Sequence, residues 1–151
     1  MTKLTLISAV GIALSCSALA HEGHEHATGV VRERMELMTD MGQRLLAISK
    51  RLRANKDLES ITNDARAIRE LASKITPLFP PGSTQFPTAA KPAIWHEWDD
   101  FTAKAKSVET ETEKLMNRST TVGDALRAQF RAVAFACDGC HEKYRVPKEK
   151  H

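Results

Sequence analysis

The chain has 151 residues, of which 42% are hydrophobic and 27% are charged, and its formal net charge is +3. This length suits one globular domain after any targeting segment is removed. The near balance of 22 basic and 19 acidic side chains argues against a nucleic-acid-binding protein, because such proteins concentrate positive charge.

Residues 1–20 predict a cleaved secretory signal peptide. Lys3 precedes an apolar run, and Ala18, Leu19 and Ala20 form a small-x-small cleavage pattern. The apolar run is too short to span a bilayer, so we expect no membrane span and export to the periplasm of a Gram-negative bacterium. Cleavage removes one lysine and one of the three cysteines, Cys16, and leaves about 131 residues with a charge of about +2.

Residues 21–28 form a histidine-rich leader, and residues 148–151 form a short polar tail. We expect both segments to be disordered. The alternative for the leader is a copper, nickel or zinc site, in which His21, His24 and His26 act together with the free α-amine.

Two amphipathic helices are predicted next, over about residues 29–55 and 57–79. Apolar residues recur at spacings of three and four in both segments, which gives each helix one apolar face. In the first helix this face consists of Val31, Met35, Met38, Met41, Leu45, Ile48 and Leu52. The second is followed by the proline-rich segment "TPLFPPGSTQFPTAAKP", which predicts a long loop.

Two further helices are predicted on either side of "NRST", residues 117–120. The third begins at Pro92, a residue that suits a first helical turn, and includes Trp98 on its inner face. The fourth ends before Pro147. No segment alternates with the period of a strand, so residues 29–147 predict an all-α, antiparallel four-helix bundle.

The sequence "CDGCH" at residues 137–141 is the strongest functional signal. Cys137 and Cys140 are three residues apart on the fourth helix, and His141 is four residues after Cys137, so all three project from one side. Thioredoxin-like C-x-x-C motifs start a helix in a βαβ unit, and structural zinc needs four ligands, so neither fits well. C-x-x-C-H is the attachment signature of c-type haem, in which two thioethers hold the porphyrin and the histidine binds iron.

Iron bound by His141 has a second axial position, for which Met38 is the candidate. It lies in the middle of the first helix's apolar face, and Gly42 follows one turn later and removes a side chain there. A His/Met pair favours electron transfer, whereas an open position favours the binding of small ligands. The alternative is that Met38 only packs in the core.

The chain resembles the class II c-type cytochromes, the family of cytochrome c′ and cytochrome c-556, and is more similar to the low-spin c-556 type. "RMELMTDMG" is similar to the family's first-helix segment, "LFPPGS" and "AKPAIW" to its crossover loop and third-helix start, and "CDGCHEKYR" to its haem-binding end. The resemblance implies four helices around one covalently attached haem c.

The resemblance also implies roles for particular residues. Members of the c-556 type carry a methionine ligand followed four residues later by glycine, which Met38 and Gly42 match, and this implies a one-electron carrier. Members of the c′ type leave iron five-coordinate and bind nitric oxide or carbon monoxide, which is the first alternative. A thiol-redox or metal-handling module without haem is the second.

Arg145, four residues after His141, matches a family arginine that lies beside the haem, near the histidine or the propionates. Its alternative is a solvated cation in the last helical turn. The family also implies redox partner proteins and a possible homodimer. No paired general acid and base is evident, so we do not predict an enzyme.

Overall fold

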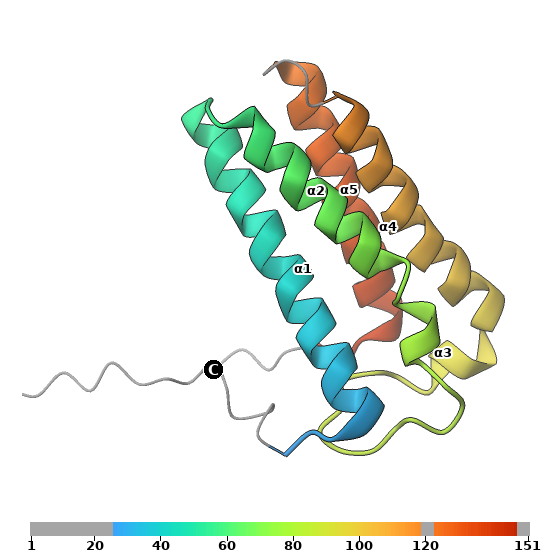
Figure 1. The fold of residues 1–151 in the computed structure, drawn as a ribbon. Coiled ribbons are helices and arrows are strands. Elements are labelled where there is room, and N and C mark those ends of the chain that lie inside the picture. The colour runs from blue at the N-terminus through green and yellow to red at the C-terminus, as the bar shows by residue number, and fades with distance from the viewer. Residues whose placement is uncertain (1–25, 119–122, 148–151) are drawn as a thin grey trace, which may run out of the picture.

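The structure is a computed structural model that describes residues 26–118 and 123–147, and its four long helices form an antiparallel bundle (Figure 1). Within these residues no strand occurs, and the single β-bridge joins Ala90 to Arg145. The predicted all-α four-helix bundle is therefore confirmed. The elements are α1 (Gly29–Ala54), α2 (Leu58–Ala72), the short 3-10 helix η1 (Thr76–Leu78), α3 (Ala93–His96), α4 (Trp98–Arg118) and α5 (Asp124–Tyr144). The predicted signal peptide, most of the leader and the tail lie outside the described residues.

The core follows the apolar faces of the four long helices. Fully buried side chains include Ile48 on α1, Ile68 on α2, Leu115 on α4 and Val133 on α5. The face of α1 differs from the predicted one, because Arg34 and Leu37 are buried whereas Met35 and Met38 are only partly buried. Spacings of three and four leave this choice open, since Leu37 is also four residues from Met41.

Two predicted helix boundaries are wrong. α2 ends at Ala72 rather than near residue 79, and the chain continues through a turn into η1. Pro77 explains this end, because a proline lacks the amide proton of a helical hydrogen bond and its ring clashes with the preceding turn. The predicted third helix is broken at Glu97 into α3 and α4, and Trp98 is 36% exposed instead of facing the core.

The crossover loop between η1 and α3, residues 79–92, is held by the buried guanidinium of Arg34 on α1. Arg34 Nη2 donates to the Leu78 carbonyl at 2.9 Å and to Ser83 Oγ at 2.7 Å, and Nη1 donates to Thr88 Oγ1 at 3.1 Å. The guanidinium also lies 3.9 Å from the centroid of the Phe79 ring. One side chain therefore satisfies several polar groups of a loop that has no secondary structure of its own.

Replacing Arg34 is expected to destabilise the fold. Arg34→Met leaves the carbonyls of Leu78 and Ser83 without their charged donor, so we expect the free energy of unfolding to fall by about 2–4 kcal/mol. The measurement is urea denaturation followed by circular dichroism.

The matched control is Arg32→Met on the same helix. Arg32 pairs only with Glu36, and both side chains are more than half exposed, so the expected loss is under about 0.5 kcal/mol. An equal loss in the two variants would contradict the role assigned to Arg34.

Candidate functional site

The "CDGCH" segment lies in the last two turns of α5, and the residue that ends this helix fixes its position against α4. The Tyr144 hydroxyl donates to Asp100 Oδ2 at 2.5 Å, and its ring meets Phe101 edge-on with centroids 5.5 Å apart. Lys143 donates to the same carboxylate at 3.0 Å and pairs with Glu97. The hydrogen bond from Tyr144, followed by that from Lys143, lowers the pKa of Asp100, so this acceptor stays ionised.

Beyond Tyr144 the chain is extended and pairs with the crossover loop. The Lys91 amide donates to the Tyr144 carbonyl at 2.9 Å, and the Val146 amide donates to the Ala89 carbonyl at 2.8 Å. Arg145 lies between these two hydrogen bonds, in extended backbone, rather than in the last helical turn. The loop that Arg34 fixes to α1 is thus also fixed to the end of α5.

Cys137 and Cys140 are free thiols, and both are partly buried against the core. Burial, with smaller contributions from Asp138 and Cys140, raises the pKa of Cys137 to about 11. Burial also raises the pKa of Cys140. Both side chains therefore stay protonated at neutral pH, as thiols and not as thiolates.

His141 is partly buried on the same side of α5. Burial, and then the positive charge of Arg145, lowers the pKa of the imidazole, while Asp138 acts in the opposite direction. A neutral imidazole is the form that binds a metal ion.

His141 and Arg145 both line an open groove of about 760 Å³. This volume falls in the range of small-molecule and cofactor sites. The other lining residues come from α5 and the segment after it, and they are Phe135, Asp138, Gly139, Glu142, Val146 and Pro147.

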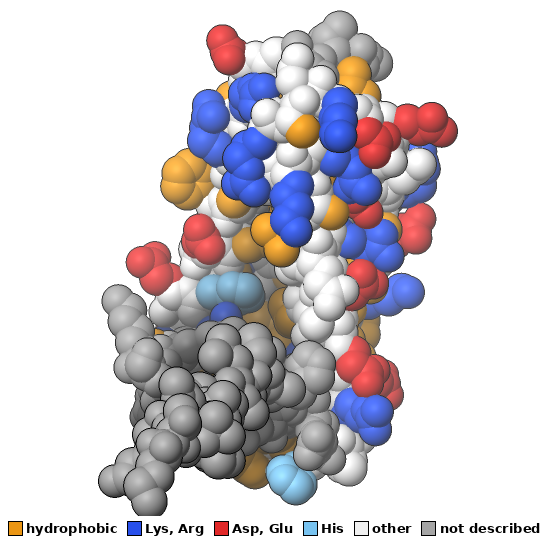
Figure 2. All heavy atoms as spheres, turned by 90° about the vertical axis from the view of Figure 1, so that its left-hand side faces the viewer, with side chains coloured by type: hydrophobic (Ala, Val, Ile, Leu, Met, Phe, Trp, Pro, Cys, Tyr) orange, Lys and Arg blue, Asp and Glu red, His pale blue; other side chains and the backbone are white. Residues whose placement is uncertain are grey.

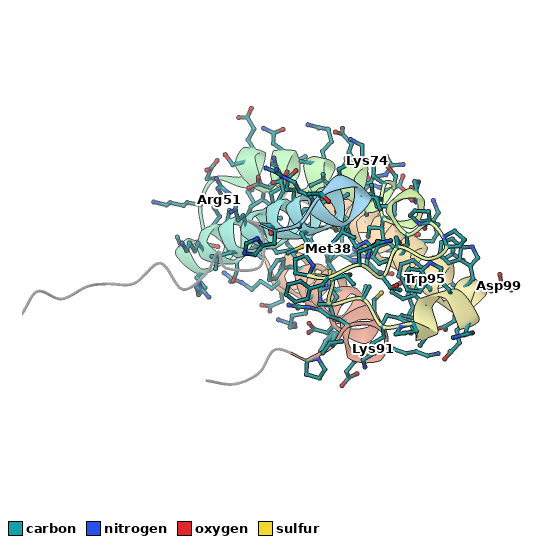
Figure 3. The ribbon with its side chains drawn as sticks, turned by 90° about the horizontal axis from the view of Figure 1, so that it is seen from below. Met38, Arg51, Lys74, Lys91, Trp95 and Asp99 are labelled. Carbon is teal, nitrogen blue, oxygen red and sulfur yellow. The ribbon has the colours of Figure 1, made fainter. Side chains whose placement is uncertain are left out.

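Met38 lies on the side of α1 that faces α5 when the bundle is seen from below (Figure 3). It is partly buried against the core, and it is not among the residues that line the groove. The helices α1 and α5 touch at only a few places, whereas α1–α2, α2–α4 and α4–α5 are packed closely.

Two glycines leave open space along these two helices. A Cβ atom added at Gly42 on α1 or at Gly139 on α5 would meet no other side chain or distant backbone within 4 Å. A flat, bulky group could therefore approach both backbones.

The residues present fit a covalently bound haem. Two free thiols at the attachment spacing and a neutral imidazole beside a groove of cofactor size are the groups that such a cofactor requires, and the open space at Gly42 and Gly139 does not obstruct it. Cys137, Cys140 and His141 lie in the last two turns of α5 and Arg145 directly follows the helix, but of these four only His141 and Arg145 line the groove. The structure places Met38 on the neighbouring helix α1, outside the lining of the groove.

Three supporting features were missed by the sequence reasoning. The burial of Arg34 was not predicted, because arginine side chains are usually exposed and nothing near Arg34 in the sequence indicates its partners. The hydrogen bond between Tyr144 and Asp100 joins residues 44 positions apart, and the pairing of the loop with the end of α5 has no local signal.

The described residues contain no helix with the length and hydropathy needed to cross a membrane. Within the same residues, no group of three or more histidine, cysteine, aspartate or glutamate side chains is arranged to hold a bare metal ion.

Comparisons with known proteins agree with this geometry. The chain is 29% identical to cytochrome c-556 of Agrobacterium tumefaciens (strain II Chrys) over 122 residues, which cover 80% of the chain and 99% of the relative. It is 25% identical to cytochrome c′ of Rhodospirillum rubrum over 150 residues, covering 97% and 99%. The crystal structure of cytochrome c′ from Thermochromatium tepidum has the same fold, with a TM-score of 0.73 at 23% identity, covering 78% of this chain and 95% of the other.

The family model described as Cytochrome C′ matches residues 29–145, which span all four helices of the bundle and the "CDGCH" segment. The chain therefore belongs to the cytochrome c′ family and is a haem protein of the electron-carrier kind with covalently attached haem c.

Proposed function

We propose that this protein is a periplasmic one-electron carrier whose single haem c is attached through Cys137 and Cys140 and has His141 and Met38 as axial ligands. The observation that carries the proposal is the grouping on α5. Two free, partly buried thiols stand on the same side of the helix as a neutral imidazole, which lines a groove of cofactor size.

The protein supplies attachment, orientation and polarity, and the haem supplies the redox chemistry. Thioether bonds from Cys137 and Cys140 would fix the porphyrin against α5. The hydrogen bonds of Tyr144 would then hold the end of that helix, and with it His141, in one orientation relative to α4. Such support keeps the ligand set rigid, which limits the reorganisation that accompanies electron transfer.

Met38 is proposed as the second ligand because α1 is the helix that lies across from α5 without closely contacting it. The open space beside Gly42, one turn from Met38, would let the porphyrin approach α1. The similarity to a relative named cytochrome c-556 supports the same assignment. A thioether sulfur opposite an imidazole raises the reduction potential and favours electron transfer over ligand binding.

Arg145 is proposed to lie beside the haem and to balance the negative charge of its propionates. It lines the same groove as His141, and the pairing of its neighbours with residues 89–91 limits its movement. A cation at this position would also stabilise the reduced haem, which carries one positive charge fewer than the oxidised haem, and would thereby raise the reduction potential.

Export is proposed from the sequence pattern of residues 1–20, and it agrees with the attachment of haem c outside the cytoplasm. Soluble redox proteins of the same compartment would be the partners. A homodimer is a further possibility that the family relationship raises, and gel filtration of the purified protein tests it.

The second candidate function is the binding of nitric oxide or carbon monoxide at a five-coordinate iron. It is favoured by the similarity to the cytochrome c′ of Rhodospirillum rubrum along nearly the whole chain. In that case Met38 would only pack against the core, as its partial burial also allows.

Replacing Met38 distinguishes the two candidates. Met38→Ala should convert low-spin haem to high-spin haem and make its absorption spectrum sensitive to carbon monoxide, because the variant lacks the sixth ligand. The measurement is the optical spectrum of the reduced holoprotein with and without carbon monoxide.

The controls are Met35→Ala and Met41→Ala, each one turn of α1 away, which should remain low-spin. A wild-type spectrum that is already high-spin and shifts with carbon monoxide would favour the five-coordinate protein. A spin change in Met35→Ala instead would move the ligand by one helical turn.

Attachment through both thiols is tested by mass spectrometry of the mature protein. The wild-type chain should carry the mass of one haem, and the double variant Cys137→Ser with Cys140→Ser should show the polypeptide mass alone. A wild-type chain without added mass would leave only the haem-free thiol module.

The raised pKa of Cys137 predicts how the haem-free chain reacts with thiol reagents. In a Cys140→Ser variant the rate of alkylation by iodoacetamide should keep rising with pH up to about 11, because only the thiolate reacts. The urea-unfolded chain should level off near 9, the ordinary value. The unfolded thiol ionises first, so the folded state should lose stability as pH rises from about 9 to about 11. Equal midpoints for the folded and unfolded chains would contradict the protected environment of this thiol.

A further inference from the structure

We propose that the redox partner is an acidic protein and that it docks on a basic surface where the upper parts of α1 and α5 lie side by side. This proposal rests on the proposed electron-carrier function. The surface is built by Arg53 on α1 and by Arg127 and Arg131 on α5, which we call the arginine cluster. The three side chains line one small hollow of about 140 Å³ together with Ser49, Leu52 and Phe130. Figure 2 shows lysine and arginine side chains gathered over the upper half of the face on which α1 lies.

The arginine cluster differs from the other interhelical arginines in having no acidic partners. Arg44 and Arg51, on the side of α1 that faces α2, reach the two oxygens of Asp64 at 3.2 and 2.6 Å. Arg69 on α2 lies 3.8 Å from Glu109 on α4. In the part of the chain that the structure describes, none of the three cluster arginines forms an ion pair or a side-chain hydrogen bond.

The unpaired arginines matter because the charges of the whole chain nearly cancel. Basic and acidic side chains nearly balance, so the molecule as a whole has little charge with which to attract a partner. The nearest acidic residue along α5 is Asp124, one turn before Arg127, and it is exposed. Positive charge left unpaired on one face creates a local field, which orients an approaching partner of opposite charge and speeds its association.

Apolar side chains beside the arginine cluster suit a protein partner better than a free anion. Phe130 lines the hollow and is partly buried, and Phe135, one helical turn after Arg131, is 72% exposed. Arginine and aromatic residues are enriched where protein interfaces gain most of their binding energy.

The arginine cluster also lies close enough to the haem-binding groove to serve electron transfer. Phe135 lines that groove and is one helical turn from Arg131. Arg131 precedes His141 by ten residues, which corresponds to about 15 Å along the axis of α5. A protein seated on the cluster would therefore cover the upper rim of the groove.

The test compares two double variants of the holoprotein that change the net charge equally. Arg127→Glu with Arg131→Glu reverses two charges of the cluster. Arg66→Glu with Lys74→Glu, the α2 control, reverses one exposed cation of α2 and one of the turn that follows it. Lys74 lies on the side of the molecule away from α5 (Figure 3). The rate of oxidation of the reduced protein is measured with ferricyanide, an anionic oxidant, and with tris(phenanthroline)cobalt(III), a cationic one.

Reversal of the cluster should slow oxidation by ferricyanide about tenfold at low salt and accelerate oxidation by the cobalt complex. The α2 control should change both rates less than about twofold. Equal changes in the two double variants would show that only net charge matters and would overturn the proposal.

Binding is located with an acidic polypeptide, poly-L-glutamate, added to the ¹⁵N-labelled reduced holoprotein. Nuclear magnetic resonance signals of Arg53, Arg127 and Arg131 should shift, and salt should reverse the shifts. If the shifts lie elsewhere, the docking surface is wrong. If vesicles of phosphatidylglycerol bind through the cluster while poly-L-glutamate does not, the partner is a membrane surface and the proposal fails.

These outcomes are separate from those of the Met38 experiment. A high-spin wild-type spectrum would overturn His/Met ligation without altering the comparison of rates between the two double variants. An unchanged low-spin spectrum together with equal rates would overturn only the docking surface.

Discussion

The site depends on the buried guanidinium of Arg34. It makes hydrogen bonds with Leu78, Ser83 and Thr88. These bonds hold the crossover loop, which has no secondary structure of its own, between α1 and the end of α5. A cation in a low-dielectric position is stable only where several acceptors surround it, so the loop and the arginine constrain one another. Since the far end of the same loop pairs with residues 144 and 146, the separation of α1 from α5 at the level of His141 depends on this contact.

The environment at the end of α5 suits the covalent attachment that we propose for Cys137 and Cys140. Burial keeps the thiol of Cys137 protonated, and burial together with Arg145 keeps His141 neutral, so neither side chain is charged at neutral pH. Tyr144, held by Asp100, supports the last turn of the same helix. The attachment that we propose and the support of the helix end thus involve different residues.

Much of this arrangement could be predicted from the sequence, for identifiable reasons. The four long helices follow from the spacing of apolar residues within each segment, although that spacing left the buried face of α1 open, and the spacing of Cys137, Cys140 and His141 is local. The break at Glu97 and the burial of Arg34 could not be predicted, because both depend on partners far away in the chain. Lys143 pairs with the carboxylate of Glu97, and the Tyr144 hydroxyl donates to its carbonyl. The backbone conformation of Glu97 therefore depends on contacts with the end of α5. Which arginines form ion pairs could not be predicted for the same reason, because only the packed bundle shows which of them have a carboxylate beside them.

The two attachments of the crossover loop leave a short stretch between them, residues 84–87, in which Phe86 is 86% exposed. This stretch should therefore tolerate added residues. An insertion there would form a surface bulge and leave both attachments in place. One extra residue beyond Thr88 would instead shift the pairing of Ala90 with Arg145 by one position and would turn the side chain of Arg145 away from the groove.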